Sequence, residues 1–491
     1  MFRHGDKDIA TGSDDLWRVS CLDAARDGIY APEPGVFDEA VAADGSVRPG
    51  YGDLVDALCE QDLAGLADAL ADESRARGMV FRSHGKTEEF RLDPVPRLIA
   101  ASEWSTLERG LTQRVRALDR FVADVYADCE VVAAGIVPER VLHGCDHYEP
   151  RARELPPAPV RIGVAGLDVV RDADGRLGVL EDNVRTPSGI AYALVARDCL
   201  DGQLPSELAE GRLAIEGAVD LLARTLREAA PAGVSDPAVV MLSDGPENSA
   251  WYEHERLARL VGLPIVSLRD LSVRGGRLVA RIDRDRVPVD VVYRRTDEDR
   301  LTDERGELTD VGASLFEPMR RGTLTCVNAF GTGVADDKLT HAYVEDLVRF
   351  YLGEDPLLAS VKTYDPDDPA QLDAVLHRIG ELVVKPRTGH GGHGVVVAAH
   401  ARGEDVRAAA GALRDDPSSY VVQETVMIST HPTVVDGQLE PRHVDLRPFV
   451  FLAGGEARVL PGGLTRVAFD AGALVVNSSQ RGGGKDTWVM E

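Results

Sequence analysis

Apolar residues recur at spacings of three and four along two early stretches, Asp53 to Arg75 and Trp104 to Tyr126. This spacing gathers apolar side chains on one face of a helix, so we expect an amphipathic helix in each. Between them, Gly85 to Pro96 is polar and contains prolines, which favours a connecting segment. Residues 1–155 are therefore predicted to be mostly helical. The proline-rich stretch 155–159 is a candidate domain boundary.

In the middle of the chain, the pattern alternates between strands and helices. Residues 238–242 and 264–268 are short apolar runs that predict buried strands, and Trp251 to Val261 between them has helical spacing. A second unit starts near Thr323, with an apolar run followed by a helix that contains Lys338. Alternating strands and helices predict a largely parallel sheet.

The last third of the chain contains short strands. Glu381 to Pro386 and Val395 to Ala398 lie on either side of a glycine-rich loop, and Tyr420 to Glu424 forms the next apolar run. Further short strands are expected at 447–452, 458–460 and 474–476.

The composition of the chain mainly excludes some classes of partner and location. The 491 residues are 44% hydrophobic and 28% charged, as expected for a soluble protein of two to four domains. The net charge of −27 argues against nucleic acid and anionic membranes as partners, since both need a cationic surface. We see no apolar run of about 18 residues and no apolar core in the first eight residues, so neither a membrane span nor a secretory signal is expected. The six cysteines are scattered, which fits reduced thiols in a cytoplasmic protein.

The strongest chemical signal is a predicted hairpin between Asp168 and Asn183. Two apolar runs lie on either side of an Asp-Ala-Asp-Gly turn. Glu181 and Asn183 point to the same face of their strand, and Asp168 on the partner strand can join them. Oxygen ligands of this kind suit Mg²⁺ that is bound to substrate phosphates. A polar surface hairpin would have a similar pattern, but the apolar run that leads directly into the acidic triplet favours a metal site.

A second signal is the glycine-rich loop with Gly389, Gly391, Gly392 and Gly394. It contains a G-x-G-x-x-G pattern, but a dinucleotide-binding loop must open a helix, and this one opens a strand. A glycine loop between antiparallel strands can instead cover phosphates with its backbone N–H groups. Lys385, on the strand that enters the loop, would add a positive charge. The alternative is an ordinary hairpin with a surface lysine.

Together these motifs resemble the ATP-grasp signature. They are Lys385, the Gly389–Gly394 flap, the Gln423-Glu424 pair, and the Asp168…Glu181-x-Asn183 hairpin. In the usual order the lysine strand and flap precede the metal hairpin. Here the hairpin precedes Lys385 by about 200 residues, so the chain resembles the circularly permuted ATP-grasp family. Further stretches that resemble this family are 109–126, 180–189, 442–449, 461–466 and 477–488. His390 and His393 in the flap depart from the usual pattern.

The resemblance implies a fold that combines α/β and α+β parts. A mostly helical region (1–155) is followed by the metal-binding hairpin and a helix of the ATP-grasp core (156–230). A Rossmann-like α/β domain, the pre-ATP-grasp domain, then spans 231–345. The nucleotide-binding lobes of the ATP-grasp fold occupy 346–491.

The resemblance also implies ATP and Mg²⁺ as cofactors and assigns residues to them. Asp168, Glu181 and Asn183 would hold Mg²⁺ against the ATP phosphates. Lys385 would contact the phosphates, and Lys338 resembles the second nucleotide lysine. The adenine would be lined by Gln423, Glu424 and Val426.

Three arginines are candidates to hold a carboxylate substrate and its acyl phosphate, because arginine binds such groups bidentately. They are Arg185, Arg447 and Arg466, each close to a glycine-rich or metal motif. Each taken alone is more often part of a surface ion pair.

The expected activity is an ATP-dependent carboxylate–amine ligase that forms an amide through an acyl phosphate and releases ADP and phosphate. The alternatives are an ATP-dependent phosphotransferase and a non-catalytic nucleotide-binding scaffold. The resemblance implies that the carboxylate and amine substrates are small molecules or peptides. Relatives of this family are often associated with helical companion proteins, so such a partner is plausible, as is a homo-oligomer.

Overall fold

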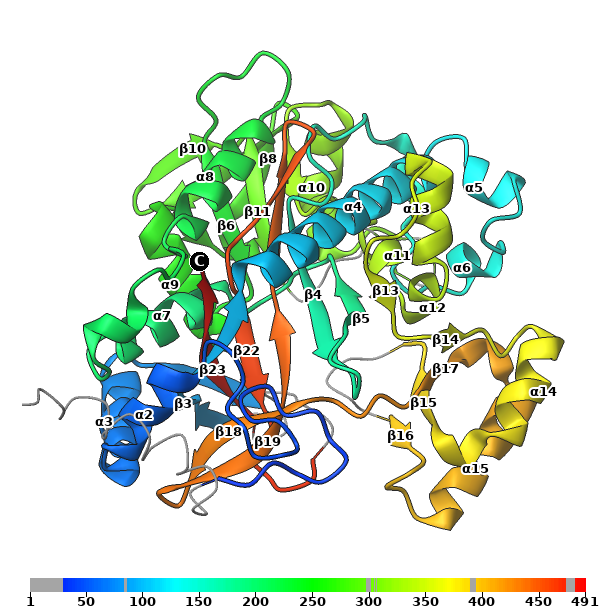
Figure 1. Cartoon of the computed structure of the whole chain (residues 1–491). Helices are drawn as coiled ribbons and strands as arrows, with labels where there is room; N and C mark the ends of the chain where they lie inside the picture. The colour runs from blue at the N-terminus through cyan, green and yellow to red at the C-terminus, as the bar shows by residue number, and fades with distance from the viewer. Residues whose placement is uncertain are drawn as a thin grey trace, which may run out of the picture.

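The computed structural model describes residues 30–83, 86–296, 302–303, 305, 307–388, 394–473 and 482–491. Its centre is a ten-stranded sheet that runs through the middle of the molecule (Figure 1). The main path of this sheet is β13-β5-β4-β19-β22-β23-β3, while β18 pairs with β19, and β20 pairs with both β4 and β21. The strands are β3 (Arg91–Ala100), β4 (Val164–Arg171), β5 (Leu177–Asn183), β13 (Ala359–Ser360), β18 (Thr430–Val435), β19 (Gln438–Arg447), β20 (Phe449–Ala453), β21 (Glu456–Val459), β22 (Leu464–Val467) and β23 (Gly483–Met490).

The long helix α4 (Ala101–Val125) crosses one face of this sheet (Figure 1). Its buried residues include Trp104, Leu111, Leu118 and Phe121, which share one helical face. The helix α13 (Val344–Leu352) packs beside it. The amphipathic helix predicted for this region is confirmed.

The first predicted helix is divided into α2 (Gly52–Cys59) and α3 (Leu63–Ala76). The connection predicted between Gly85 and Pro96 is wrong, because β2 (Lys86–Glu89) pairs with β1 (Val80–Ser83) and most of the remainder belongs to β3. Strand β3 pairs in parallel with β23, and its register shifts next to its two prolines. Proline has no N–H to donate, and an irregular edge position tolerates this loss.

A second sheet is parallel, with the order β12-β11-β6-β7. The strand–helix–strand unit predicted around 238–268 is confirmed within it. Its strands and helices are β6 (Val239–Ser243), β7 (Ile265–Val266), β11 (Val291–Arg295), β12 (Thr325–Val327), α8 (Ala218–Glu228), α9 (Trp251–Val261) and α10 (Asp310–Arg320). A three-stranded antiparallel sheet accompanies it, formed by β8 (Leu271–Arg274), β9 (Arg277–Ile282) and β10 (Asp285–Pro288).

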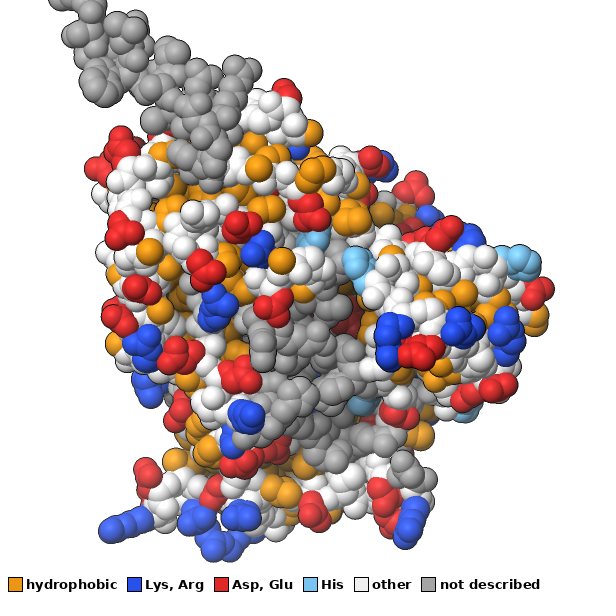
Figure 2. Space-filling model, turned by 90° about the horizontal axis from the view of Figure 1, so that it is seen from below, with side chains coloured by type: hydrophobic (Ala, Val, Ile, Leu, Met, Phe, Trp, Pro, Cys, Tyr) orange, Lys and Arg blue, Asp and Glu red, His pale blue; other side chains and the backbone are white. Residues whose placement is uncertain are grey.

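A smaller lobe projects from the side of the molecule (Figure 1). Its antiparallel sheet has the order β14-β17-β15-β16 and is accompanied by two helices. These elements are β14 (Thr363–Tyr364), β15 (Leu382–Pro386), β16 (Val396–Val397), β17 (Tyr420–Glu424), α14 (Pro369–His377) and α15 (Gly403–Asp415). Leu382, Val384, Leu413 and Val422 form its separate core. Acidic and basic side chains intermingle over the described part of the face seen in Figure 2.

The other α-helices are short or serve the site directly. They are α5 (Glu130–Ala133), α6 (Arg140–His143), α7 (Ile190–Leu200), α11 (Gly333–Asp336) and α12 (Lys338–His341). The strand predicted at 474–476 lies outside the described residues. Among the helices in the described part of the chain, none has both the length and the apolar character needed to span a bilayer.

Candidate functional site

A cleft of about 460 Å³ brings together residues from the projecting lobe and the ten-stranded sheet. Its lining includes the end of the β4–β5 hairpin, the strands β15 and β17, and the first residue of α12. The first turn of α7 and the arginines of β19 and β22 also line it. The motifs that the sequence analysis selected from distant parts of the chain therefore meet in one place.

The predicted β4–β5 hairpin is confirmed, and it places the three proposed metal ligands together. Asp168 lies opposite Glu181 in the antiparallel register, and Asn183 follows two residues later on the same face. All three line the cleft. The turn is fixed by the Asp172 carboxylate, which accepts hydrogen bonds from two backbone N–H groups, and by Gly175, whose φ of +81° suits glycine.

Asp182, between the two proposed ligands, is held by a different set of partners. Arg114 of α4 donates two hydrogen bonds to its carboxylate, at 2.6 and 2.7 Å, and His341 Nδ1 lies 2.8 Å away. Burial opposes ionisation, but Arg114 and His341 hold the pKa of Asp182 well below its usual range. This pairing anchors β5 to α4, and the alternation of the strand then turns Glu181 and Asn183 toward the cleft.

Asp168 is the centre of a buried cluster of two acids and two arginines. Arg447 donates from Nε and Nη2 to its carboxylate, at 2.7 and 2.9 Å. Arg466 Nη2 lies 2.8 Å from Asp168 Oδ2, and Arg466 Nε also donates to Asp445 at 2.8 Å. Burial opposes ionisation of Asp168, yet the two arginines lower the pKa of its carboxyl group. Two of the arginines proposed to bind substrate are thus paired with carboxylates.

The third arginine, Arg185, follows directly after the hairpin strand. Its Nε lies 3.1 Å from Asp336 Oδ1, and the other oxygen of Asp336 accepts the backbone N–H groups of Val184 and Arg185. Arg185 also lines the cleft. Asp336, which the sequence analysis did not single out, therefore fixes the backbone and the side chain at this corner.

Both predicted lysines reach the cleft from different elements. Lys385 of β15 donates to Gln423 Oε1 at 2.5 Å. Burial lowers the pKa of Lys385, although the negative charge of Glu181 opposes this shift. Lys338 Nζ lies 3.8 Å from Glu181 Oε1. The Asp337 side chain caps α12 by accepting the Leu339 N–H at 2.8 Å, which fixes the helix that begins at Lys338.

The predicted Gln423-Glu424 pair lines the cleft, but both side chains have partners in the protein. Gln423 Nε2 donates to Thr363 Oγ1 at 3.0 Å. Glu424 accepts hydrogen bonds from Tyr364 and Arg378, at 2.6 and 2.9 Å. The walls here are apolar, and besides the predicted Val426 they are formed by Leu180, Val383, Val397 and Ile428. The sequence analysis missed these four residues because their apolar type is equally typical of strand cores.

The glycine-rich flap is described only in part. Gly389, Gly391 and Gly392 lie outside the described residues. Gly394 has a φ of +73°, and a Cβ atom at this position would lie 2.8 Å from Pro386 Cγ. The antiparallel pairing of β15 and β16 on either side of the loop is confirmed.

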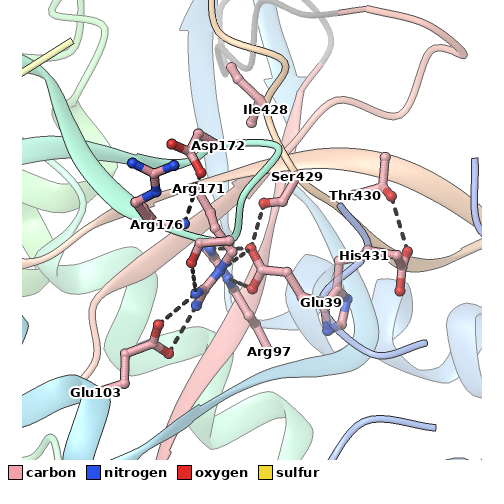
Figure 3. A network of polar contacts seen from close by, with 12 residues as sticks. Glu39, Arg97, Glu103, Arg171, Asp172, Arg176, Ile428, Ser429, Thr430 and His431 are labelled. Carbon is pink, nitrogen blue, oxygen red and sulfur yellow. Dashed lines mark hydrogen bonds and ion pairs between the residues drawn. The ribbon is translucent and has the colours of Figure 1, made fainter. Parts of the chain in front are cut away.

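A buried polar network lies beside the cleft (Figure 3). Arg97 of β3 donates two hydrogen bonds to Glu39, at 2.6 and 2.7 Å, and Arg171 Nε lies 3.2 Å from the same carboxylate. Ser429 Oγ donates to Glu39 Oε1 at 2.5 Å, and Arg171 also pairs with Glu103 of α4. Burial opposes ionisation, but Arg97 and Arg171 hold the pKa of Glu39 well below its usual range.

This network joins two parts of the cleft. Arg171 is the last residue of β4, whose Asp168 belongs to the acid–arginine cluster. Ser429 follows Ile428 of the apolar wall, and its backbone N–H donates to the Arg171 carbonyl at 2.9 Å. Glu39 therefore ties the hairpin to the apolar wall, and no sequence motif indicated this role.

The donor set fits a magnesium ion bound to phosphates. In the described part of the chain, no three His, Cys, Asp or Glu side chains form a metal-binding group. Glu181 and Asn183 nevertheless present an adjacent carboxylate and amide oxygen, and the buried Asn183 Nδ2, which has no hydrogen-bond partner, could donate to a phosphate oxygen beside the metal. Mg²⁺ is commonly held by one or two protein oxygens together with substrate phosphates and water. Asp168 would act beside them while also pairing with its arginines.

Comparisons with known proteins identify a family and relatives for this chain. Residues 96–468 match the family described as circularly permuted ATP-grasp type 2. The chain is 42% identical over 462 residues to an uncharacterized protein of Mycobacterium tuberculosis, covering 92% of this chain and 84% of that protein. It is 44% identical over 468 residues to a Frankia casuarinae protein titled "Putative glutamate--cysteine ligase 2-2", covering 93% of this chain and 54% of that protein.

A solved structure shares the fold. It is a glutathione synthetase-like effector from Globodera pallida in its apo form, with a TM-score of 0.56 and 12% identity, covering 88% of this chain and 98% of that one. At this identity the likeness concerns the fold alone. The resemblance of the permuted motifs is thus confirmed by the family match and by relatives aligned over most of the chain. The chain belongs to the circularly permuted ATP-grasp type 2 family.

Proposed function

We propose that the protein is an ATP-dependent carboxylate–amine ligase that forms an amide or peptide bond and releases ADP and phosphate. One observation carries this proposal: Glu181 and Asn183, two lysines and the Asp168–arginine cluster line a single cleft. The family membership and the ligase title of the Frankia relative support the same class of reaction.

In this proposal each group controls charge during phosphoryl transfer. Mg²⁺ held by Glu181 and Asn183 would neutralise charge on the phosphates. Lys338 lies 3.8 Å from Glu181, and the charge of Glu181 also acts on Lys385, so both lysines would contact the same phosphates. The apolar wall from Leu180 to Ile428 would enclose the adenine.

The arginines would act on the other substrate. A substrate carboxylate oxygen attacks the γ-phosphorus, and the bond to ADP breaks. Arg447, Arg466 and Arg185 would hold the carboxylate and then the acyl phosphate. The amine nitrogen attacks the acyl carbon, phosphate leaves with the carboxylate oxygen, and the surplus amine proton passes to water. Asp168 and Asp445 keep Arg447 and Arg466 oriented for this task.

We further propose that the parallel sheet β12-β11-β6-β7 is a Rossmann-like pre-ATP-grasp domain and that the protein acts in the cytoplasm. The β6–α9–β7 unit supports the first assignment, since a strand–helix–strand crossover is the building block of such folds. Ser249 and Ala250, just before α9, line the same cleft.

Nucleotide binding is tested by thermal unfolding with Mg²⁺ and a non-hydrolysable ATP analogue. A ligand that binds only the folded protein raises its melting temperature. We expect a Mg²⁺-dependent rise in the wild type that is lost in Glu181→Gln and Lys385→Ala. Glu317→Gln, on α10 and not among the residues that line the cleft, is the matched control and should keep the rise. No rise in the wild type at millimolar nucleotide would contradict nucleotide binding and, with it, the ligase proposal.

The reaction class is tested with hydroxylamine in place of the amine. An acyl phosphate reacts with hydroxylamine to give a hydroxamate, whereas a phosphate ester does not. Hydroxamate formation that requires ATP and a carboxylate would support the ligase. A stable phosphorylated product without hydroxamate would instead assign the protein as a phosphotransferase.

A further inference from the structure

The cleft continues beyond the acid–arginine cluster along a line of apolar contacts. Arg447 Nη1 donates to the Ser188 carbonyl at 3.3 Å, and Ser188 and Gly189 both line the cleft. A Cβ atom on Gly189 would lie 3.3 Å from the Leu464 side chain, so Leu464 follows directly. A Cβ atom on Gly484 would lie 3.2 Å from Leu464 and 2.8 Å from the Phe90 ring, which connects Leu464 to the next part of the wall.

This far end is built from aromatic rings. Phe90 and Tyr192 have ring centroids 4.7 Å apart, and Phe81 meets Phe90 edge-on at 6.4 Å. All three line the cleft, with exposed fractions of 3%, 6% and 8% for Phe90, Tyr192 and Phe81. The Tyr192 hydroxyl donates to the Val80 carbonyl at 2.7 Å. Its polar atom is thus already bonded, and the ring can present an apolar surface.

The charged groups at this end already have partners within the protein. Arg82 is the charged residue beside Phe81 in the described lining, and its guanidinium binds Glu247 at 2.9 Å and the Pro246 carbonyl at 2.7 Å. Glu253 accepts the Gly189 N–H at 2.6 Å, but it is fully buried. An acidic or basic side chain placed here would lose water, and an acid would have to compete with Glu247 and the Pro246 carbonyl for Arg82, so an apolar group is favoured over a charged one.

We propose that the carboxylate substrate carries a bulky apolar side chain, aliphatic or aromatic, that packs against the wall formed by Leu464, Phe90, Tyr192 and Phe81. This inference rests on the proposed ligase function. With the reacting carboxylate at Arg447 and Arg466, the rest of the substrate extends along Ser188 and Leu464 to the rings. A free amino acid such as leucine or phenylalanine, or a peptide that ends in one, has this chemistry.

The test is hydroxamate formation with Mg²⁺, ATP, hydroxylamine and a matched panel of carboxylates. The panel contains phenylalanine, leucine, alanine and glutamate, each free and as the C-terminal residue of a glycyl dipeptide. We expect kcat/KM for phenylalanine or leucine to exceed that for alanine and glutamate at least about tenfold, as filling an apolar pocket gives. Equal or better activity with alanine or glutamate would overturn this inference and leave the ligase proposal intact.

A variant tests whether the aromatic wall causes the preference for a bulky apolar side chain. Phe81→Ala should reduce the ratio of phenylalanine to alanine activity several-fold, while Phe350→Ala on α13 should leave this ratio unchanged. The nucleotide-induced rise in melting temperature, measured on both variants, shows that each is folded. An unchanged ratio in folded Phe81→Ala would overturn the inference. If no carboxylate gives hydroxamate although the nucleotide binds, the ligase proposal fails and this inference fails with it.

Discussion

Charged side chains of the cleft are mostly paired with one another. Asp168 binds Arg447 and Arg466, and Arg185 binds Asp336. A phosphate or carboxylate that enters must therefore exchange partners with fixed groups. Such groups have already lost their water and are held in position, which favours charge stabilisation during a reaction.

At the scale of single residues, the buried His254 leads to a prediction of how stability depends on pH. Burial lowers the pKa of His254 to about 2, and the positive charge of Arg295 adds to the shift. Its Nδ1 lies 2.8 Å from Ser243 Oγ. Because the folded-state pKa lies below the unfolded value of 6.5, protonation favours the unfolded state. The contribution of the neutral imidazole to the free energy of unfolding is fully present above pH 6.5. It decreases as the pH falls below 6.5, by about 2 kcal/mol at about pH 5.

The measurement is the free energy of unfolding in urea from about pH 7.5 to 5. We expect His254→Gln to be less stable at neutral pH but to show a shallower decline in acid. His377→Gln, at an exposed site on α14, is the control and should keep the wild-type slope. Parallel curves for wild type and His254→Gln would contradict the prediction.

At the scale of elements, two glycines within helices allow the effect of helix propensity on stability to be distinguished from the effect of side-chain packing. Alanine is favoured over glycine in a helix interior by about 1 kcal/mol. At Gly110 of α4, however, a Cβ atom would lie 2.7 Å from Leu358 Cβ, whereas at Gly411 of α15 nothing lies within 4 Å. Overpacking costs about 1–3 kcal/mol. We expect Gly110→Ala to destabilise by up to about 2 kcal/mol and Gly411→Ala to stabilise by roughly 0.5–1 kcal/mol.

Urea unfolding of these two variants checks the signs. Gly411→Ala serves as the matched control, since it makes the same chemical change where there is space. A gain in stability for Gly110→Ala would show that α4 can move away from Leu358 at little cost.

The Glu39 network connects the segment just before β18 to the apolar wall of the cleft, where the nucleotide is proposed to bind. Ser429→Ala removes a hydrogen bond to a buried carboxylate, which should cost about 1.5–3 kcal/mol of stability. It also loosens the segment that carries Ile428, so we expect the affinity for the ATP analogue to fall roughly tenfold. Both are measured by thermal unfolding at a series of nucleotide concentrations.

Thr433→Val, on the strand β18 that begins directly after Ser429, is the matched control. The Thr433 hydroxyl donates to the His431 carbonyl at 3.1 Å and has no bond to Glu39. We expect it to lose stability without losing affinity. If Ser429→Ala also keeps the wild-type affinity, the network is structural only.

At the scale of the whole molecule, an early strand and the last strand of the described chain pair in one sheet. Strand β23, residues 483–490, lies between β22 and β3, and β3 comes from residues 91–100. The ten-stranded sheet thus takes strands from three of the four segments predicted from the sequence. Folding requires contacts between residues almost 400 positions apart, so the final strand is expected to contribute strongly to stability.

Trp488 tests this dependence. Its side chain is 2% exposed and Nε1 donates to Asp486 at 2.5 Å. We expect Trp488→Ala to lower the free energy of unfolding by about 3–5 kcal/mol. Leu357→Ala, at a site 48% exposed, should change it by less than about 0.5 kcal/mol. Urea unfolding of both variants is the measurement, and a small loss for Trp488→Ala would show that the sheet does not depend on its last strand.

Local patterns were sufficient for several elements. Helical spacing predicted α4 and α9, and the Asp-Ala-Asp-Gly turn between apolar runs predicted the β4–β5 hairpin. These features depend on neighbours within a few residues, so their physical cause is present in the sequence itself. The β3 strand was missed because its partner, β23, lies at the other end of the chain.

The sequence by itself determined the family, through the spacing of Asp168, Glu181 and Asn183 and the position of Lys385 after them. Only the tertiary structure decided which charges meet. Arg447 reaches Asp168 across 279 positions of sequence, and Glu39 reaches Ser429 across 390. Such pairings follow from strand order and register, which arise from the burial of whole sheets. A local sequence pattern cannot predict these pairings. The residues around each partner look the same whichever distant strand the sheet places beside it.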